Sequence, residues 1–209
     1  MHRVQDIVRN FPLTNQVFTW DALHCQKKTI NLICARGNDY LIAVKKNQRG
    51  LYKCLEMEGA TTSAVSTHIT EEKSHGRHIT RQVSVFKTPE SVQVQWANSQ
   101  RFIQVQRSVM RGEKYYKETG YYLSICQDSA EVFAEKIRGH WRIENQLHWV
   151  KDVIFEEDKS PLHQFQAVTN FSILSTIAMN IYRILGFLSV TEGRRWLDGR
   201  FWRLMILLE

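Results

Sequence analysis

The residues best equipped for chemistry lie between Arg138 and Asp152, which read Arg-Gly-His-Trp-Arg-Ile-Glu-Asn-Gln-Leu-His-Trp-Val-Lys-Asp. This stretch gathers two tryptophans, two histidines and three cationic side chains around one central acid, Glu144. A carboxylate among aromatic side chains is costly to bury unless a cation or a metal ion is its partner. Glu144 is therefore a candidate metal ligand. The alternative, a surface glutamate in an ordinary salt bridge, stays open on composition alone.

A second acid, Asp21, directly follows the β-prone run Val17–Trp20. We expect it at the carboxyl end of a strand, where open α/β sheets bind their ligands. Hard cations such as Mg²⁺ take one or two carboxylates and complete their shell with water and substrate phosphate. Two such ions can activate an attacking oxygen and stabilise the leaving oxygen in phosphoryl transfer. Periodicity alone does not bring Asp21 and Glu144 together, so their convergence is a hypothesis.

A helix is expected to carry Glu144, because residues 131–155 contain no proline and a single glycine. Its apolar stripe recurs at helical spacing and consists of Ile143, Leu147, Val150 and Ile154. Glu144 lies on the shoulder of this stripe, with His140 and His148 four residues before and after it. We expect these histidines and Trp141 to pack around the acid and support it rather than to ligate a metal.

The remaining elements predict an α/β unit followed by antiparallel strands. Strands at 17–20 and 40–44 alternate with helices at about 25–36 and 51–58, which indicates a parallel pair. From 61 to 125 the composition shifts toward Ser, Thr, Gln and Val, and strands are expected at 80–86, 92–96, 102–106 and 121–125. A long helix is expected over about 165–185, followed by a short amphipathic helix in the tail.

Charge and cysteine usage narrow the class of protein. The formal net charge is +7, yet the block 121–160 around Glu144 is acidic. A basic periphery around an acidic centre suits a polyanion held over a cation site, with ordinary charge scatter as the alternative. The cysteines, at 25, 34, 54 and 126, have neither zinc nor disulfide spacing, so reduced thiols in the cytoplasm are expected. No signal peptide and no membrane span are expected.

Two groups of side chains are candidates for binding the backbone of a nucleic acid. The first is the basic loop after the strand at 40–44, formed by Lys45, Lys46, Asn47 and Gln48. A solvated loop is its alternative. The second group borders Glu144 and consists of Arg138, Arg142 and Asn145.

Several segments have the order and spacing of a known family. They are Asp21-Ala-Leu-His-Cys-Gln-Lys27, Lys45-x-Asn-Gln48, His75-Gly-Arg77, Arg138-Gly-His-Trp-x-Ile-Glu-Asn-x-Leu-His-Trp149 and Asp152-x-x-Phe155-x-Glu-Asp158. The chain thereby resembles bacterial insertion-sequence transposases of the DDE class, in the H-repeat-associated branch. The resemblance runs from about Val4 to about Tyr182, and its His-Trp-x-Ile-Glu-Asn core is highly specific to that branch.

This resemblance implies an RNase H-like fold and DNA strand cleavage and joining with two Mg²⁺ or Mn²⁺ ions. Asp21 would be the second acid of the catalytic triad and Glu144 the third, both as metal ligands. Lys151 matches a basic residue that the wider class often has seven residues after the glutamate, and is a candidate phosphate contact; a plain surface lysine is the alternative. The implied partners are the element ends and target DNA, with a homodimer on DNA as a candidate assembly in the cytoplasm and nucleoid.

The same resemblance divides the chain into four parts. Residues 1–60 form the RNase H-like α/β part with the second acid, and 61–125 form an inserted β-rich segment. Residues 126–190 carry the catalytic-glutamate helix and a core helix that completes the RNase H-like domain, and 191–209 form a C-terminal tail. The expected fold is α/β, an RNase H-like core lacking its first strands.

The sequence departs from the family at the first acid, which the family places in an Asp-Gly-Lys-type segment well before the second. No such segment precedes Asp21, and the lone Asp198-Gly199 pair follows Glu144. Asp6 is a poor substitute, because it lies only fifteen residues before Asp21 in a polar, helix-prone context. We therefore expect a truncated, carboxy-terminal copy that is catalytically inactive alone. The alternative is a non-catalytic DNA-binding remnant that competes with an intact transposase.

Overall fold

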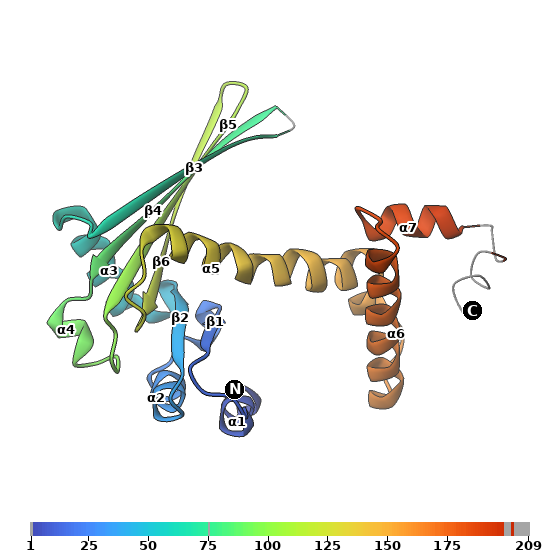
Figure 1. The fold of residues 1–209 in the computed structure, drawn as a ribbon, viewed down its shortest axis with the longest axis horizontal. Helices are drawn as coiled ribbons and strands as arrows, with labels where there is room; N and C mark the ends of the chain where they lie inside the picture. Colours follow the sequence, from blue (N-terminus) through green and yellow to red (C-terminus); the bar gives the residue numbers. More distant parts are fainter. Residues whose placement is uncertain (1, 75, 199–201, 203–209) are drawn as a thin grey trace. The chain divides into compact units, whose positions relative to one another are not determined.

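The computed structural model describes residues 2–74, 76–198 and 202, and the chain divides into two compact units, Met1–His140 and Trp141–Glu209. The first unit holds a six-stranded sheet with helices, and the second is helical (Figure 1). The mixed α/β class predicted from the sequence is confirmed.

The first unit begins with α1 (His2–Asn10) and a parallel βαβ unit. Strand β1 (Val17–Trp20) leads through helix α2 (Lys27–Ala35) to β2 (Asp39–Val44), and Trp20 pairs with Ile42 at the end of the ladder. Strand β2 is buried along nearly its whole length, as its continuous apolar sequence indicates. The predicted parallel pair is confirmed.

The β-rich segment joins this unit in the same sheet, whose strand order is β1-β2-β6-β5-β4-β3. Its four antiparallel strands are β3 (Ser66–Ser74), β4 (Arg77–Lys87), β5 (Arg101–Arg111) and β6 (Lys114–Ser124). Only the last residues of β6, Tyr121–Ser124, pair with β2. The farther halves of β3 to β6 therefore extend beyond the α/β part as a long four-stranded projection (Figure 1).

Each face of the sheet has its own apolar core. On one face α1, α2, α3 (Arg49–Thr61) and α4 (Glu90–Gln93) cover strand residues that include Tyr40, Ile42, Phe102 and Leu123. On the other face α5 (Ala130–Ile143) presents Ala130, Phe133 and Ile137 to Leu41, Val83, Val85 and Ile103. The spacing of three and four residues along α5 makes one stripe that faces the strands.

The strand predicted at 92–96 is wrong, because this segment contains the short helix α4 and a turn. Pro89 begins it, and its carbonyl accepts hydrogen bonds from the backbone N–H groups of Val92 and Gln93. Val92 and Trp96 are both 4% exposed, whereas Val94 between them is 88% exposed. Apolar residues four apart thus share the buried side, which is helical rather than strand periodicity.

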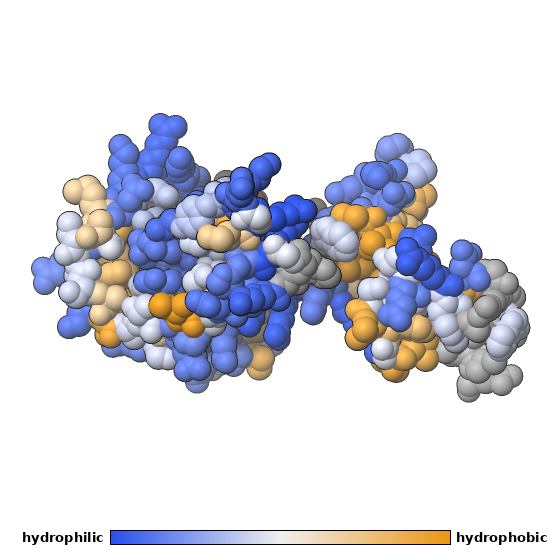
Figure 2. Space-filling view, turned by 90° about the horizontal axis from the view of Figure 1, so that it is seen from above, coloured by the Kyte–Doolittle hydropathy of each residue, from blue (hydrophilic) through white to orange (hydrophobic). Residues whose placement is uncertain are grey.

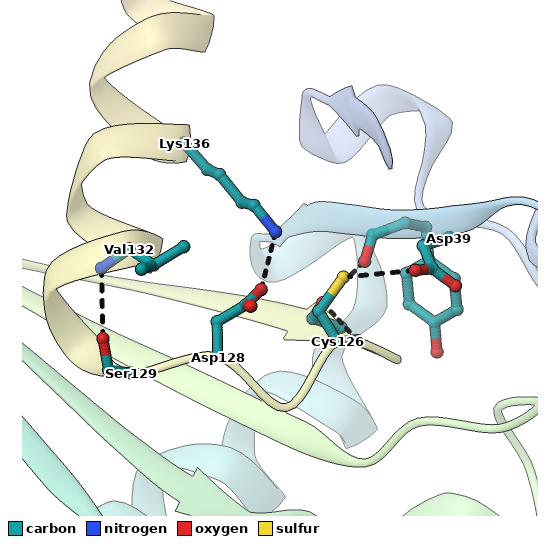
Figure 3. Close-up of polar contacts among 8 residues, drawn as sticks. Asp39, Cys126, Asp128, Ser129, Val132 and Lys136 are labelled. Atoms are coloured by element: carbon teal, nitrogen blue, oxygen red, sulfur yellow. Dashed lines mark hydrogen bonds and ion pairs between the residues drawn. The ribbon is translucent and has the colours of Figure 1, made fainter. Parts of the chain in front are cut away.

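Polar contacts fix the start of α5 on the sheet (Figure 3). Ser129 Oγ accepts a hydrogen bond from the Val132 backbone N–H at 3.4 Å, which caps the helix. Lys136 Nζ lies 2.6 Å from Asp128 Oδ2, one turn further along. Cys126 Sγ donates to Asp39 Oδ2 at 3.8 Å, so the segment before α5 is joined to the first residue of β2.

The second unit continues α5 with two π-helical stretches, Glu144–His148 and Val150–Ile154, and then contains α6 (Phe165–Ile184) and α7 (Val190–Leu197). Its core is formed by Val150, Met179, Tyr182 and Val190, and Leu147 and Ile154 pack against it. Ile143, predicted to share their stripe, is 53% exposed. Wide i→i+5 turns shift the residues that follow around the helix axis, so the predicted stripe is not continuous.

Figure 2 shows mainly hydrophilic residues on the visible side of the first unit, and apolar residues gathered on the visible side of the second. Exposed apolar side chains of α6 include Ile173, Leu174, Ile177 and Ile184. Among the described residues, no helix has both the length and the apolar character needed to cross a bilayer.

Candidate functional site

Asp21 lies where the first parallel strand ends. It directly follows β1, and Lys45 directly follows the neighbouring parallel strand β2. Since parallel neighbours end at the same edge of the sheet, both residues lie at that edge, and Lys45 Nζ is 3.0 Å from Asp21 Oδ1. Both side chains are about half exposed, at 61% for Lys45 and 49% for Asp21.

The surroundings of Asp21 favour its ionised form. Partial burial raises the pKa of this carboxyl group, but several contacts outweigh the effect. The Ala22 backbone N–H, the hydrogen bond and charge of Lys45, and the charge of His140 all lower it, so the pKa of Asp21 lies below its ordinary value. Asp21 is therefore a carboxylate over the whole neutral range, as a metal ligand must be.

The loop that holds Asp21 is bonded to the loop after β2. Asn47 Nδ2 donates to the Ala22 carbonyl at 2.7 Å, and Gln48 Nε2 donates to the Cys25 carbonyl at 2.8 Å. These two amides satisfy carbonyl groups of the short 3₁₀ turn Ala22–His24 and its end. Sequence reasoning missed this role. The predicted DNA contacts of Asn47, Gln48 and the exposed Lys46 stay predictions.

Helix α5 brings His140 to the same edge. His140 follows Ile137 on the sheet-facing stripe, and its Nδ1 lies 3.3 Å from Oγ1 of Thr19 in β1. The hydroxyl and the ring nitrogen form a hydrogen bond whose direction depends on the imidazole tautomer. The charge of His140 also lowers the pKa of Asp21. The structure thus gathers Asp21, Lys45 and His140 from three separate segments.

Arg138 lies one turn before the end of α5 and contacts the far strand of the sheet. Its Nη2 is 3.5 Å from Oε1 of Glu72 in β3, and the other carboxylate oxygen of Glu72 is 2.9 Å from Arg81 Nη1. The pKa of Glu72 is lowered by Arg81 first, and then by the charges of Arg138 and Arg107. Arg138 is half exposed and retains donors for a further anion.

Lys151, in the second unit, is mostly enclosed rather than on the surface. Its Nζ donates to Ser172 Oγ at 2.7 Å and to the Ser172 carbonyl at 3.1 Å, and lies 3.7 Å from Glu157 Oε1. The side chains of Lys151 and Glu157 are only 15% and 16% exposed. A phosphate contact of Lys151 stays a prediction, and it requires these contacts to be exchanged.

The other predicted site residues lie in or next to the π-helical stretch of the second unit. Trp141, Arg142 and His148 are exposed, and their predicted roles around Glu144 stay predictions. The backbone of Glu144 begins the π-helical stretch. The side chains of Glu144 and Asn145 lie outside the described part of the structure. π-Helical turns are rare and are frequent at functional sites, which is consistent with a special role for this stretch.

One described side chain has the chemistry of a metal ligand. Asp21 offers an ionised, half-exposed carboxylate of the kind that Mg²⁺ and Mn²⁺ prefer. Within the described residues, no three His, Cys, Asp or Glu side chains come together in a group that could hold a metal ion. Asp21 therefore fits as one ligand of a site that requires carboxylates from elsewhere.

The arrangement of an acid after β1, a basic loop after β2 and a downstream glutamate helix can be compared with known proteins. The family model of the transposase DDE domain matches residues 1–181. This chain belongs to the DDE transposase family. As a family, DDE transposase domains act with divalent metal ions.

Curated relatives in this family come from Escherichia coli. YbfL and the H repeat-associated YhhI, both of strain K12, are each 32% identical over 189 residues, covering 85% of this chain and 50% of their own length. YncI of strain O157:H7 is 32% identical over 192 residues, covering 86% of this chain and 49% of its own. YhhI and YncI are described as candidate transposases. The chain thus spans about half the length of the relatives that it matches.

Among solved structures, DesVI of Streptomyces venezuelae matches 56% of this DDE transposase chain and 47% of its own, with 11% identity and a TM-score of 0.27. A similarity of this size does not indicate a shared fold.

Proposed function

We propose that this chain forms part of the RNase H-like catalytic domain of a DDE transposase, which cuts and joins DNA by metal-dependent phosphoryl transfer. The observation that carries the proposal is the ionised Asp21 at the carboxyl end of β1, beside the parallel strand β2. The family match over residues 1–181 supports the DNA substrate.

In this proposal Asp21 and Glu144 are the second and third acids of the triad. Bound divalent ions would supply charge stabilisation for the attacking and leaving oxygens. Asp21 is held in its ionised form by Lys45, and its loop is held by Asn47 and Gln48. His140, bonded to Thr19, fixes its part of α5 against β1. Lys45 can exchange its bond to Asp21 for a DNA phosphate.

We further propose that this chain alone does not cleave DNA. The family uses three acids, and the segment before Asp21 contains no Asp-Gly-Lys-type site. With one bridging carboxylate fewer, two ions of like charge would not be held side by side. The proposed inactivity applies to this chain by itself. DNA and divalent metal ions are the proposed ligands of a catalytic domain that has all three acids.

The experiment measures metal binding at Asp21 separately from activity. Mn²⁺ is titrated into isotope-labelled protein, and paramagnetic broadening of backbone signals is mapped by NMR. Broadening should centre on residues 20–25 and 45–48 and be lost in Asp21→Asn. An Asp6→Asn variant, which removes an exposed carboxylate of α1, is the matched control. Broadening that is unchanged in Asp21→Asn would contradict the assignment of Asp21.

Activity is measured in parallel as nicking of supercoiled plasmid DNA with Mg²⁺ or Mn²⁺. We expect no cleavage by the purified chain. Cleavage that Asp21→Asn and Glu144→Gln both abolish would overturn the proposed inactivity and leave the catalytic assignment standing. Cleavage that survives both substitutions would overturn the assignment of these acids.

A further inference from the structure

The projection formed by β3 to β6 has a cationic side. In antiparallel strands, directly paired residues lie on one face, and that face repeats every second residue. The face that carries Val83, Val85 and Ile103 under α5 continues outward along the same strands. Its outermost row across three strands is Arg77, Arg111 and Lys114, because Arg77 pairs with Arg111 and Arg111 pairs with Lys114. We call these three residues the outer row.

A second set of cations lies four residues closer to α5 on the same face. Arg81 pairs with Arg107, and Arg107 pairs with Glu118 on β6. Arg81 contacts Glu72 at 2.9 Å, and Arg138 of α5 reaches the same carboxylate at 3.5 Å. The side-chain Nε of Arg107 is buried and has no hydrogen-bond partner among the described residues. One glutamate is therefore shared by several arginines.

These pairings oppose the stability of the sheet. Like charges directly opposite each other on neighbouring strands are destabilising. Two such arginine pairs, Arg77 with Arg111 and Arg81 with Arg107, occur four residues apart, and Lys114 extends the outer pair. Within the part of the chain that the structure describes, the side chains of the outer row have neither an ion pair nor a hydrogen bond. Their repulsion would be relieved by an external anion.

The opposite face of the same projection differs in charge. Its paired residues are mainly neutral, and they include Thr80 with Ser108, Gln82 with Gln106, Ser84 with Gln104 and Gln106 with Thr119. Its cations in the outer half, Lys73 and Lys117, pair with His78 and Ser108 and do not lie opposite each other. A solubilising surface would not concentrate arginines on one side, so the asymmetry points to a ligand on the face shared with α5.

We propose that this cationic face, centred on Arg77, Arg111 and Lys114 and continued by Arg81, Arg107 and Arg138, binds the phosphate backbone of duplex DNA. The choice of DNA among polyanions rests on the proposed function. Arginine guanidinium groups bind phosphate through paired N–H donors, and such contacts position a protein without reading sequence. The outer and inner arginine pairs are four residues apart along the strands, or about 13 Å. This separation is close to the roughly 12 Å width of the major groove, so the two pairs can contact phosphates on both of its sides.

The test is salt-dependent binding of a fluorescein-labelled 30-base-pair DNA duplex, followed by fluorescence anisotropy with EDTA present. Each phosphate contact contributes about 0.9 to the slope of log affinity against log salt, which is about eightfold in affinity at 0.1 M salt. The double variant Arg77→Gln/Arg111→Gln should therefore lower the slope by about two and weaken binding at 0.1 M salt roughly 60-fold.

The matched control, Lys73→Gln/Lys117→Gln, removes the same charge from the other face of the same projection. It should leave the slope within about half a unit of the wild-type value, because it removes no phosphate contact. Equal losses in the two double variants, or no loss in Arg77→Gln/Arg111→Gln, would overturn the proposal. An effect of Arg77→Gln/Arg111→Gln on duplex RNA of the same sequence and none on DNA would overturn the assignment to DNA.

Folding is checked by thermal melting without DNA, where relief of repulsion predicts a midpoint for Arg77→Gln/Arg111→Gln no lower than that of the wild type. If that variant fails to fold, Lys114→Gln, at an exposed position of β6, should still lower the slope by about one. An unchanged slope in Lys114→Gln would then overturn the outer row as a phosphate site. Binding in EDTA is independent of metal at Asp21, so failure of this inference and failure of the proposed function give different results.

Discussion

Lys45 and Asp21 are 24 residues apart in the chain, yet Lys45 Nζ lies 3.0 Å from Asp21 Oδ1. The parallel pairing of β1 and β2 produces this contact, because each residue directly follows its strand. A cation is thus already bound to the carboxylate that we propose as a metal ligand. Lys45 lowers the pKa of Asp21, and its side chain could also move to a bound phosphate.

The first prediction concerns which cation, Lys45 or His140, lowers the pKa of Asp21 more. Lys45→Met should raise the pKa of Asp21 more than His140→Gln, because Lys45 both bonds to the carboxylate and acts on it by charge, whereas His140 acts by charge only. The pKa is followed by the carboxyl-carbon chemical shift of Asp21 in an NMR titration from pH 2 to 6. A larger rise in His140→Gln would contradict the geometry of the ion pair.

The second prediction concerns how much Asp21 contributes to the stability of the fold at low pH. The pKa of Asp21 is lower in the folded chain than its ordinary value of 3.8, so its ionised form stabilises the fold above that value. This contribution should be lost as the pH falls through the folded pKa. Since the pair is half exposed, Asp21→Asn should cost about 0–1 kcal/mol at pH 7. Urea unfolding at pH 7 and pH 2.5 should show that the difference in unfolding free energy between the wild type and Asp21→Asn becomes smaller in acid. A difference that grows in acid would contradict a lowered pKa of Asp21.

The third prediction separates the two roles considered for the loop after β2. Asn47→Ala and Gln48→Ala should each lower the free energy of unfolding by about 0.5–1.5 kcal/mol, because each removes a side-chain hydrogen bond to a carbonyl of the Asp21 turn. Lys46→Ala, at an exposed neighbour, should change it by less than about 0.5 kcal/mol. Urea unfolding measures all three. Equal effects in the three variants would show that the amides do not hold the turn.

The fourth prediction concerns the enclosed pair in the second unit. Lys151→Met removes the donor to Ser172 and the cation near Glu157, and should destabilise this unit by about 1–3 kcal/mol. Lys159→Met is the matched control, since Lys159 is 73% exposed and pairs with Glu156 three residues away. It should cost less than about 0.5 kcal/mol. Hydrogen exchange of the α6 amides measures the stability of this unit. Unchanged protection in Lys151→Met would contradict the prediction.

The fifth prediction compares two glycines in helices. A Cβ on Gly193 in α7 would overlap Cδ1 of the Tyr182 ring, so Gly193→Ala should destabilise the second unit by about 1–3 kcal/mol. Gly139 in α5 has nothing within 4 Å of such a Cβ, so Gly139→Ala should stabilise the first unit by up to about 1 kcal/mol. Thermal melting measures the stability of both variants. Changes of the same sign would contradict the packing described for one of the two glycines.

The α/β part was predictable from sequence because the residue pattern of each element there fits only one type of secondary structure. The continuous apolar run of β2 and the position of Asp21 just after β1 identified the strand edge correctly. The 92–96 segment failed because Val-Gln-Val-Gln-Trp alternates like a strand, while Val92 and Trp96 also satisfy a spacing of four. Local periodicity cannot separate these cases, and only the tertiary partner decides between them.

The position of Asp21 at a strand end was predictable from the sequence, whereas the contacts around it were not. Lys45 was expected to contact DNA, and its bond to Asp21 depends on a strand pairing that no local pattern encodes. The enclosure of Lys151 depends on Ser172, which lies 21 residues further on. The outer row was missed for the same reason, because Arg77, Arg111 and Lys114 meet only through the register of three long strands.

The sheet has one more property that bears on activity. In the described chain β1 pairs with β2 on one side only, so its other side presents backbone N–H and C=O groups that can accept a further strand. A strand added in parallel at this border would end beside Asp21. A peptide segment supplied in trans could therefore dock there as a further strand and deliver a carboxylate next to Asp21.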